Sequence, residues 1–211
     1  NKVELRLAVN AGSILEDKDQ QGLAHFIEHM GFNGSKHFKK NELVDFLQKI
    51  GIQFGADLNA YTGFDETVYI LPVPLSDTAN LRKGFTVLQD WASGLSFDIH
   101  EIDGERGVVL EESRLGKGAD DRMFRKIYPI QYAGSKYAER LPIGKDSIIK
   151  NAKYDVVKRF YKDYYRPDLQ AIIIVGDIDI AKTEQLVKEY FSGLKNPANE
   201  RPRVKAKVPA R

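Results

Sequence analysis

Residues 22–31 read GLAHFIEHMG and carry the strongest pattern in the chain. His25 and His29 are four residues apart, so in a helix their side chains lie on one face, one turn above the other. Glu28 follows His25 by three residues and shares that face. Two imidazoles and a carboxylate that converge on one side of a helix predict a metal site with a base beside it.

The other residues of this stretch predict how the helix is held. Leu23, Phe26, Ile27 and Met30 are apolar and can anchor it in a core, and Gly31 can end it. The alternative is an ordinary amphipathic face with solvated histidines. Two of the four histidines of the chain lie here with a glutamate between them, and composition alone produces this pattern in roughly one chain in a hundred.

Composition limits the kind of protein and the kind of metal site. The 211 residues are enough for one large domain or two small ones, and 42% hydrophobic and 29% charged residues are ordinary for a globular protein. A net charge of +2 gives no reason to expect a nucleic acid partner. With no cysteine, any metal must be held by histidine and carboxylate. No apolar run reaches the length of a membrane span. The start at Asn1 leads us to expect a processed or trimmed form.

Periodicity predicts the order of the secondary structure. Strands are expected at 3–9, in a hairpin at 53–61 and 66–73, and at 169–175, where a continuous apolar run suits the centre of a sheet. Helices are expected at 41–50, 77–95, 100–115, 121–132 and 154–164, with a last one after 177, and an extended loop at 133–150. Asp19 can cap the helix of residues 22–31.

This order, with hairpin-linked strands and clustered helices, predicts an α+β fold with a largely antiparallel sheet and helices packed on one face. Residues 1–195 are expected to form the domain. Residues 196–211 hold three prolines and mostly basic charge, so we interpret them as a linker toward a second domain.

A catalytic zinc normally takes three protein ligands, so a third must come from elsewhere. Glu105 and Glu112 are seven residues apart and lie within about 20° of each other on one helix face, whereas Glu111 points about a quarter turn away. One of the aligned pair can bind the metal while the other orients a ligand. The alternatives are a solvated acidic face, or His37 or His100 as ligand, although both histidines lie among polar residues.

These motifs resemble those of a known family. The segment 25–29, HFIEH, is the inverted zinc motif H-x-x-E-H of the inverzincins, and its surroundings resemble the M16 (pitrilysin- or insulinase-like) metallopeptidases. The resemblance covers nearly the whole chain, and within the family it is to the bacterial PqqL-like zinc proteases. Its further landmarks are residues 10–13 (NAGS), 105–112 (ERGVVLEE), 165–168 (YRPD) and 175–177 (VGD).

The resemblance implies the roles of the site residues. His25, His29 and Glu112 would bind Zn²⁺, Glu28 would be the base that activates a zinc-bound water, and Glu105 would support a ligand from behind. The spacing after His29 does not fully agree with Glu112 as the ligand. There are 82 residues between His29 and Glu112 and 75 between His29 and Glu105, and the second number is nearer the family's usual count. We follow the local motif, since a loop insertion changes the count without disturbing a helix.

The resemblance also implies an activity and its partners. The expected activity is zinc-dependent endopeptidase cleavage of peptides or small unfolded proteins, with Asn59, Ala60 and Tyr61 binding the substrate backbone as an edge strand. The partner would be a second M16-type half, in the same polypeptide or in a homo- or heterodimer, and the isolated chain would bind zinc but cleave poorly. A bacterial periplasmic location is favoured over the cytoplasm. The alternative function is a non-catalytic M16-like assembly or binding subunit.

Overall fold

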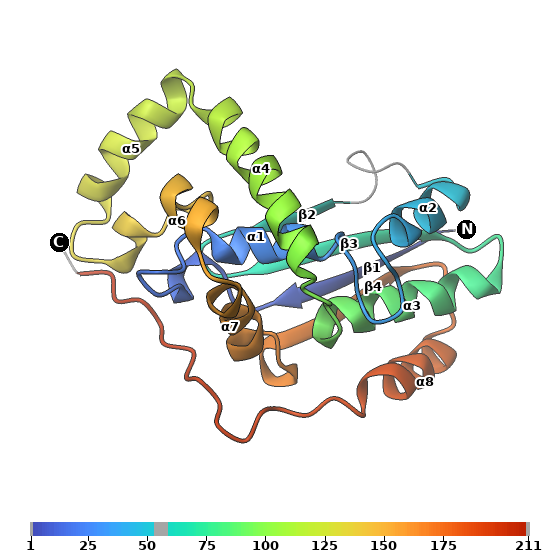
Figure 1. Cartoon of the computed structure of the whole chain (residues 1–211). Coiled ribbons are helices and arrows are strands. Elements are labelled where there is room, and N and C mark those ends of the chain that lie inside the picture. Colours follow the sequence, from blue (N-terminus) through green and yellow to red (C-terminus); the bar gives the residue numbers. More distant parts are fainter. Residues whose placement is uncertain (1, 53–58, 210–211) are drawn as a thin grey trace.

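The structure is a computed structural model that describes residues 2–52 and 59–209. In this part of the chain a four-stranded sheet lies at the centre, with the strand order β2-β3-β1-β4 and every neighbouring pair antiparallel (Figure 1). The strands are β1 (Lys2–Val9), β2 (Asn59–Thr62), β3 (Thr67–Pro74) and β4 (Gln170–Gly176). The expected α+β fold with a largely antiparallel sheet is confirmed.

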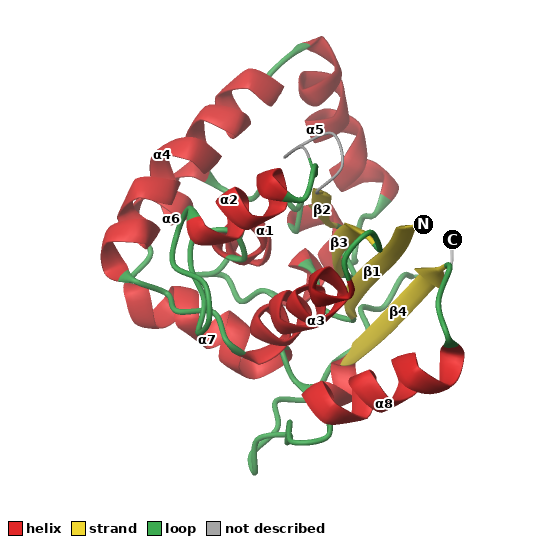
Figure 2. Ribbon diagram, turned by 90° about the vertical axis from the view of Figure 1, so that its right-hand side faces the viewer, coloured by secondary structure: helices red, strands yellow, loops and turns green. Residues whose placement is uncertain are grey.

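The helices gather on one side of this sheet, as Figure 2 shows for α1 and α3. Their bounds are α1 (Leu23–Met30), α2 (Glu42–Lys49), α3 (Thr78–Ser93), α4 (Ile99–Gly116), α5 (Ala119–Gln131), α6 (Asp146–Asn151), α7 (Tyr154–Tyr164) and α8 (Ile180–Phe191). None of the helices in the described ranges is both long and apolar enough to cross a membrane.

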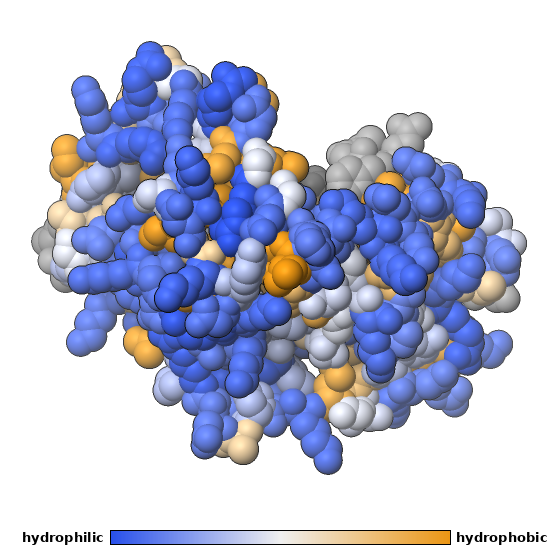
Figure 3. All heavy atoms as spheres, in the orientation of Figure 1, coloured by the Kyte–Doolittle hydropathy of each residue, from blue (hydrophilic) through white to orange (hydrophobic). Residues whose placement is uncertain are grey.

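Strand β1 shows why the sheet has one covered face. Its alternate residues, from Val3 to Val9, are buried apolar side chains beneath the helices. Glu4 and Arg6 point to the other face and pair with each other at 2.6 Å. The surface seen in Figure 3 is mostly hydrophilic, with hydrophobic residues in small separate groups.

Two expectations about the sheet and its loops are wrong. Strand β4 is at the edge of the sheet and not at its centre, and its Ile173 and Val175 are 44% and 65% exposed. A continuous apolar run permits burial of both strand faces but does not supply the second covering layer. Residues 133–150 are not one extended loop, because they contain a 3-10 helix (Lys136–Glu139) and most of α6. The residues expected as strand before Asn59, 53–58, lie outside the described residues.

The segment 196–209 follows α8 and runs along the outside of the molecule toward the end where α5 lies (Figure 1). Arg201 holds it there through ion pairs of 2.6 Å with Asp17 and 3.0 Å with Asp163. Arg203 adds a hydrogen bond of 2.6 Å to the carbonyl of Asn10. This segment therefore contacts helix α7 itself and the loop that follows β1.

Candidate metal centre

Helix α1 is fixed in the core along its apolar face. Phe26, Ile27 and Met30 are fully buried, and their burial sets which side of the helix faces outward. At its C-terminal end the indole Nε1 of Trp91 donates to the carbonyl oxygen of Gly31 at 2.8 Å. The outward face, with the two histidines, is therefore held in one orientation.

The N-terminus of α1 is bound by a residue that the sequence did not indicate. Asp19 does not cap the helix but pairs with Arg159 at 2.8 Å, so that expectation is wrong. The buried carboxylate of Glu16 instead accepts hydrogen bonds from the backbone amides of Gly22 at 3.0 Å and Ala24 at 2.8 Å. Burial raises the pKa of Glu16 to about 8, against the opposing effect of these amides.

Three side chains bring possible metal ligands together on the outward face. His25 Nε2 lies 3.3 Å from His29 Nε2 and 3.6 Å from Glu112 Oε1, and His29 Nε2 lies 3.2 Å from Glu112 Oε2. Donor atoms on a tetrahedral zinc ion, at bonds of about 2.05 Å, are about 3.3 Å apart. This donor set therefore fits zinc in its atom types and its spacing.

Glu105 lies behind this cluster. Its Oε1 is 2.7 Å from His29 Nδ1, and the amide of Asn33 donates to its Oε2 at 2.7 Å. A carboxylate bound to the far nitrogen of a histidine fixes the tautomer and aims the other nitrogen at a metal. Asn33 was not expected from the sequence, although its position four residues after His29 was an available signal. Glu111 turns away and pairs with Arg114.

The pKa values of the two histidines shift in opposite directions, and only the shift of His25 favours metal binding. Burial, together with the nearby His29 imidazole, lowers the pKa of His25 to about 4, so its ring is neutral at pH 7. Burial also lowers the pKa of His29, but the hydrogen bond and charge of Glu105 outweigh it and the net shift is upward. Zinc therefore has a free nitrogen lone pair at His25 and competes with a proton at His29.

Glu28 is buried beside the cluster and accepts a hydrogen bond from β2. The hydroxyl of Thr62, at the end of β2, donates to Glu28 Oε2 at 2.6 Å. Burial raises the pKa of Glu28, and this hydrogen bond only partly opposes the effect. Sequence reasoning gave Thr62 no role of its own, because it is 34 residues from Glu28 and no local spacing links them.

A cavity of about 340 Å³ opens over these groups. Its described lining comes from α1, β2, α4 and the segment after the 3-10 helix: His25, Glu28, His29, Ala60, Tyr61, Thr62, Glu112, Pro142 and Ile143. Ala60 and Tyr61 were expected at the site, and Asn59 begins the same strand. Pro142 and Ile143 were not expected. His37 pairs with Asp90 at 2.7 Å, and neither it nor His100 belongs to the His25–His29–Glu112 group.

Comparison with known proteins assigns the chain to a family. The model of the insulinase family of peptidases, M16, matches residues 1–141, and that of the M16 inactive domain matches residues 151–211. The chain belongs to the M16 peptidase family. It is 43% identical over 191 residues to the probable zinc protease PqqL of Haemophilus influenzae and 35% identical over 200 residues to that of Escherichia coli. These alignments cover 90% and 95% of the chain but only 21% of each relative.

A solved structure shows the same fold. The first half of the periplasmic protease PqqL from Escherichia coli matches with a TM-score of 0.91 and 33% identity, over 100% of this chain and 44% of that one. These names confirm the expected resemblance to the PqqL-like zinc proteases. The chain spans about a fifth of the length of the curated relatives it matches.

Proposed function

We propose that this chain carries the zinc centre of an endopeptidase that hydrolyses peptides or small unfolded proteins. The observation that carries the proposal is the convergence of His25, His29 and Glu112, with donor atoms 3.2–3.6 Å apart, beside the buried carboxylate of Glu28. Membership of the M16 family and the names of the relatives support the same reaction class.

In this proposal each side chain has one role. His25, His29 and Glu112 hold the zinc ion, and Glu105 orients His29 through its Nδ1. When bound, zinc polarises the scissile carbonyl and lowers the pKa of a water molecule toward about 7. Two imidazoles and one carboxylate would hold the ion and would leave it able to bind a water molecule and the substrate.

Glu28 moves the proton. Its carboxylate takes a proton from the attacking water and delivers it to the nitrogen of the leaving amine. The Thr62 hydroxyl donates to Oε2 at 2.6 Å and holds the carboxylate in position for this proton exchange. Burial raises the pKa of Glu28 toward the working pH, which suits a group that must first accept and then release a proton.

The outer edge of β2 is the proposed docking edge for the substrate. β2 pairs with β3 at one edge of the described sheet, and we propose that the backbone of Asn59, Ala60 and Tyr61 pairs with an extended peptide. Main-chain pairing of this kind binds many sequences, because it does not read side chains. It would hold the scissile bond across the cavity that Ala60 and Tyr61 line.

A second M16-type half is the proposed partner, in the same polypeptide or in a homo- or heterodimer. No lysine or arginine stands among the described residues that line the cavity, and the Glu112 side chain is 50% exposed. A second half would cover this side and supply oxyanion-binding groups. We propose residues 1–195 as the domain and 196–211 as the connection onward. The description of the Escherichia coli protein as periplasmic supports a periplasmic location.

The proposed function is tested by metal removal. We expect this chain, together with its proposed second half, to cleave unfolded peptides, to lose the activity after chelation, and to regain it with one equivalent of Zn²⁺. The isolated 211-residue chain should bind the same equivalent, measured by elemental analysis, and cleave far more slowly because the second half is missing. Peptide binding without cleavage by the zinc-loaded chain and its second half would instead favour a non-catalytic binding subunit.

Replacing Thr62 by valine tests the hydrogen bond to Glu28. Valine has a similar shape but no hydroxyl, and a hydrogen bond to a charged group contributes about 1.5–3 kcal/mol, so we expect kcat to fall about 10–100-fold. Zinc content should not change, since the Thr62 hydroxyl donates to Glu28 and Thr62 is not one of the three proposed ligands. Serine at this position restores the donor and should recover most of kcat. Equal kcat for the valine and serine variants would contradict the positioning role of this hydroxyl.

A further inference from the structure

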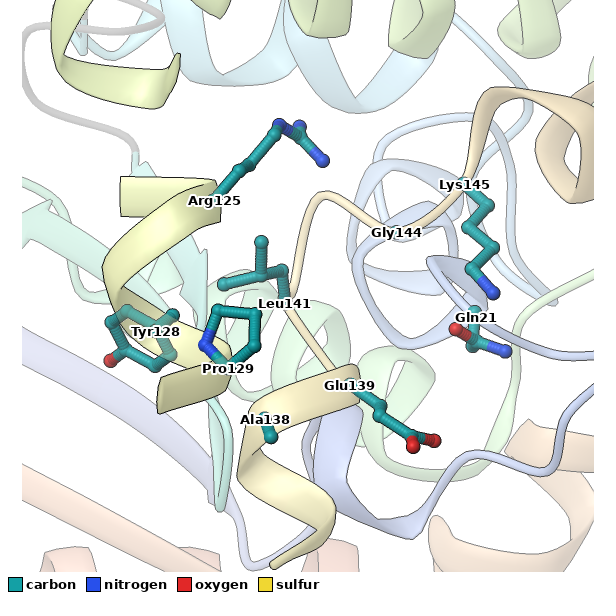
Figure 4. Close-up of a pocket in the computed structure, with 9 residues that line it drawn as sticks. All are labelled: Gln21, Arg125, Tyr128, Pro129, Ala138, Glu139, Leu141, Gly144 and Lys145. Carbon is teal, nitrogen blue, oxygen red and sulfur yellow. The ribbon is translucent and has the colours of Figure 1, made fainter. Parts of the chain in front are cut away.

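We propose that the cavity between α5 and the segment before α6 is a binding site for a free apolar amino acid. It measures about 310 Å³, and Figure 4 shows its lining from α5, from residues 138–145 and from Gln21. Among the described residues it shares no lining residue with the cavity over the metal centre. The proposed site is therefore separate from the proposed peptidase function and does not depend on it.

Gln21 gives this cavity an unpaired hydrogen-bond acceptor. The residue is 5% exposed, and its side-chain nitrogen donates to the Lys18 carbonyl at 3.0 Å, which fixes the orientation of the amide. Its Oε1 accepts no hydrogen bond from the described residues, and Figure 4 shows this oxygen on the side of Leu141. An acceptor in such a buried position is costly unless a donor reaches it, so an N–H group of a ligand would gain a hydrogen bond here.

Two cations line the cavity with donor groups that no described residue accepts. The Nε of Arg125 donates to Asp121 at 2.7 Å, and its two terminal nitrogens donate to no described residue. The Lys145 ammonium has no hydrogen bond or ion pair with the described residues. A guanidinium binds a carboxylate through two parallel hydrogen bonds, and an ammonium adds a further positive charge. We assign Arg125 and Lys145 to the carboxylate of the ligand.

Acceptors for a positive group stand on the same cavity. Glu139 lines it, and its ion pair with Arg140 spans 3.5 Å, because that guanidinium donates to the carbonyls of Glu16 and Glu139. The Glu139 carboxylate and the Gln21 oxygen both offer acceptors to an ammonium group, and Figure 4 shows the two side chains on the same side of the cavity. A ligand held by all of these groups carries one negative and one positive charge.

The remaining wall is apolar. Tyr128, Pro129 and Leu141 line it, and Figure 4 shows them on the side opposite Gln21 and Lys145. The Tyr128 ring is held by stacking on Phe64, with ring centroids 5.6 Å apart and an angle of 15° between the ring planes. An apolar side chain gains about fourfold in affinity for each methylene that it buries on such a surface. The ligand side chain is therefore aliphatic or aromatic.

The size of the cavity separates a free amino acid from a peptide. A volume of about 310 Å³ is near the lower limit for ligand sites and holds about ten groups the size of a water molecule. Leucine and phenylalanine are of this size. A free amino acid carries both charges on groups attached to one carbon atom, whereas each end of a longer peptide carries one charge and would satisfy only half of these polar groups.

The polar groups are held together before a ligand binds. Gly144 has a φ of +70°, and a Cβ atom there would lie 2.2 Å from the Cα of Gly22, so only glycine fits. The Lys145 amide donates to the Gln21 carbonyl at 3.2 Å. The residues assigned to the carboxylate and to the ammonium are thus neighbours, as the two charges of an amino acid are. Little of the site needs to be ordered when the ligand binds.

The first experiment compares ligands on the unchanged chain. A chelator keeps the protein metal-free, because an amino acid can also bind zinc at the metal centre. Isothermal titration calorimetry with leucine should give one saturable site with a Kd below about 10 mM. Leucinamide lacks the carboxylate and 4-methylpentanoate lacks the amino group, so each should bind at least about tenfold more weakly. Absence of saturation, or equal binding of leucine and 4-methylpentanoate, would overturn the proposal.

Variants then test whether the ligand lies in this cavity. Arg125→Gln should weaken leucine binding about tenfold but leave leucinamide binding nearly unchanged, because leucinamide has no carboxylate for Arg125 to bind. Glu139→Gln should weaken the binding of leucine but not that of 4-methylpentanoate. Arg122→Gln is the matched control, since Arg122 is exposed on the same helix and does not line the cavity. Equal effects of the Arg125 and Arg122 variants, with circular dichroism showing that both fold, would exclude this cavity as the site.

Discussion

Replacing Glu28 by glutamine is expected to lower kcat about 10³-fold while the zinc content stays that of the wild type. Glutamine keeps the size of the side chain and can still accept the Thr62 hydrogen bond of 2.6 Å. It cannot take a proton from water at neutral pH, and a positioned general base contributes about 10²–10⁴-fold to rate. Single-turnover cleavage of one peptide and elemental analysis of the same sample give both quantities.

Glu111→Gln is the matched control for this variant. Glu111 lies in the same segment as Glu105 and Glu112, residues 105–112. Its carboxylate is exposed and pairs with Arg114 at 2.7 Å, away from the cluster. We expect its kcat and zinc content to equal those of the wild type, because exposed pairs of this kind contribute little. If Glu28→Gln cleaves as fast as the Glu111 variant, Glu28 is not the base.

Helical spacing explains how much of the site the sequence could predict. The relative positions of His25, Glu28 and His29 follow from one turn of helix, and those of Glu105 and Glu112 follow from two turns. Regular helix geometry fixes such offsets whatever the rest of the protein does. In the structure His25, Glu28 and His29 line the same cavity, and Glu105 and Glu112 both contact His29, as their helical spacing indicates.

Contacts between segments far apart in the sequence could not be predicted in this way. Thr62 is hydrogen-bonded to Glu28, and Arg140 to Glu16, only because the sheet and the helices bring distant segments together. For the same reason Ile143 lines the cavity. No periodic pattern of residues in the sequence predicts these long-range contacts. The edge position of β4 is a similar case, since the apolar run describes the strand and not the layer that covers it.

The identity of the third ligand is tested by comparing Glu112→Gln with Glu105→Gln. We expect Glu105→Gln to weaken zinc binding by about 10–100-fold, the usual effect of losing a partner that orients a ligand. Glu112→Gln should weaken it by more than about 100-fold, because a carboxylate oxygen is lost from the donor set itself. Competition with a chelator of known zinc affinity, at fixed pH, measures both values.

The stability of the two variants should change in the opposite order to their zinc affinity. The Glu112 side chain is 50% exposed, so its neutral substitute leaves no buried group unpaired and the free energy of unfolding of the metal-free protein should hardly change. The Glu105 side chain is 10% exposed and accepts hydrogen bonds from Asn33 and His29, so Glu105→Gln should lower that free energy by about 1–3 kcal/mol. A larger loss of zinc affinity in Glu105→Gln than in Glu112→Gln would make Glu105 the third ligand, as the count of residues after His29 suggests. Large losses of both zinc affinity and stability at Glu105 alone would have the same meaning, because Glu112 would then serve neither the metal nor the fold.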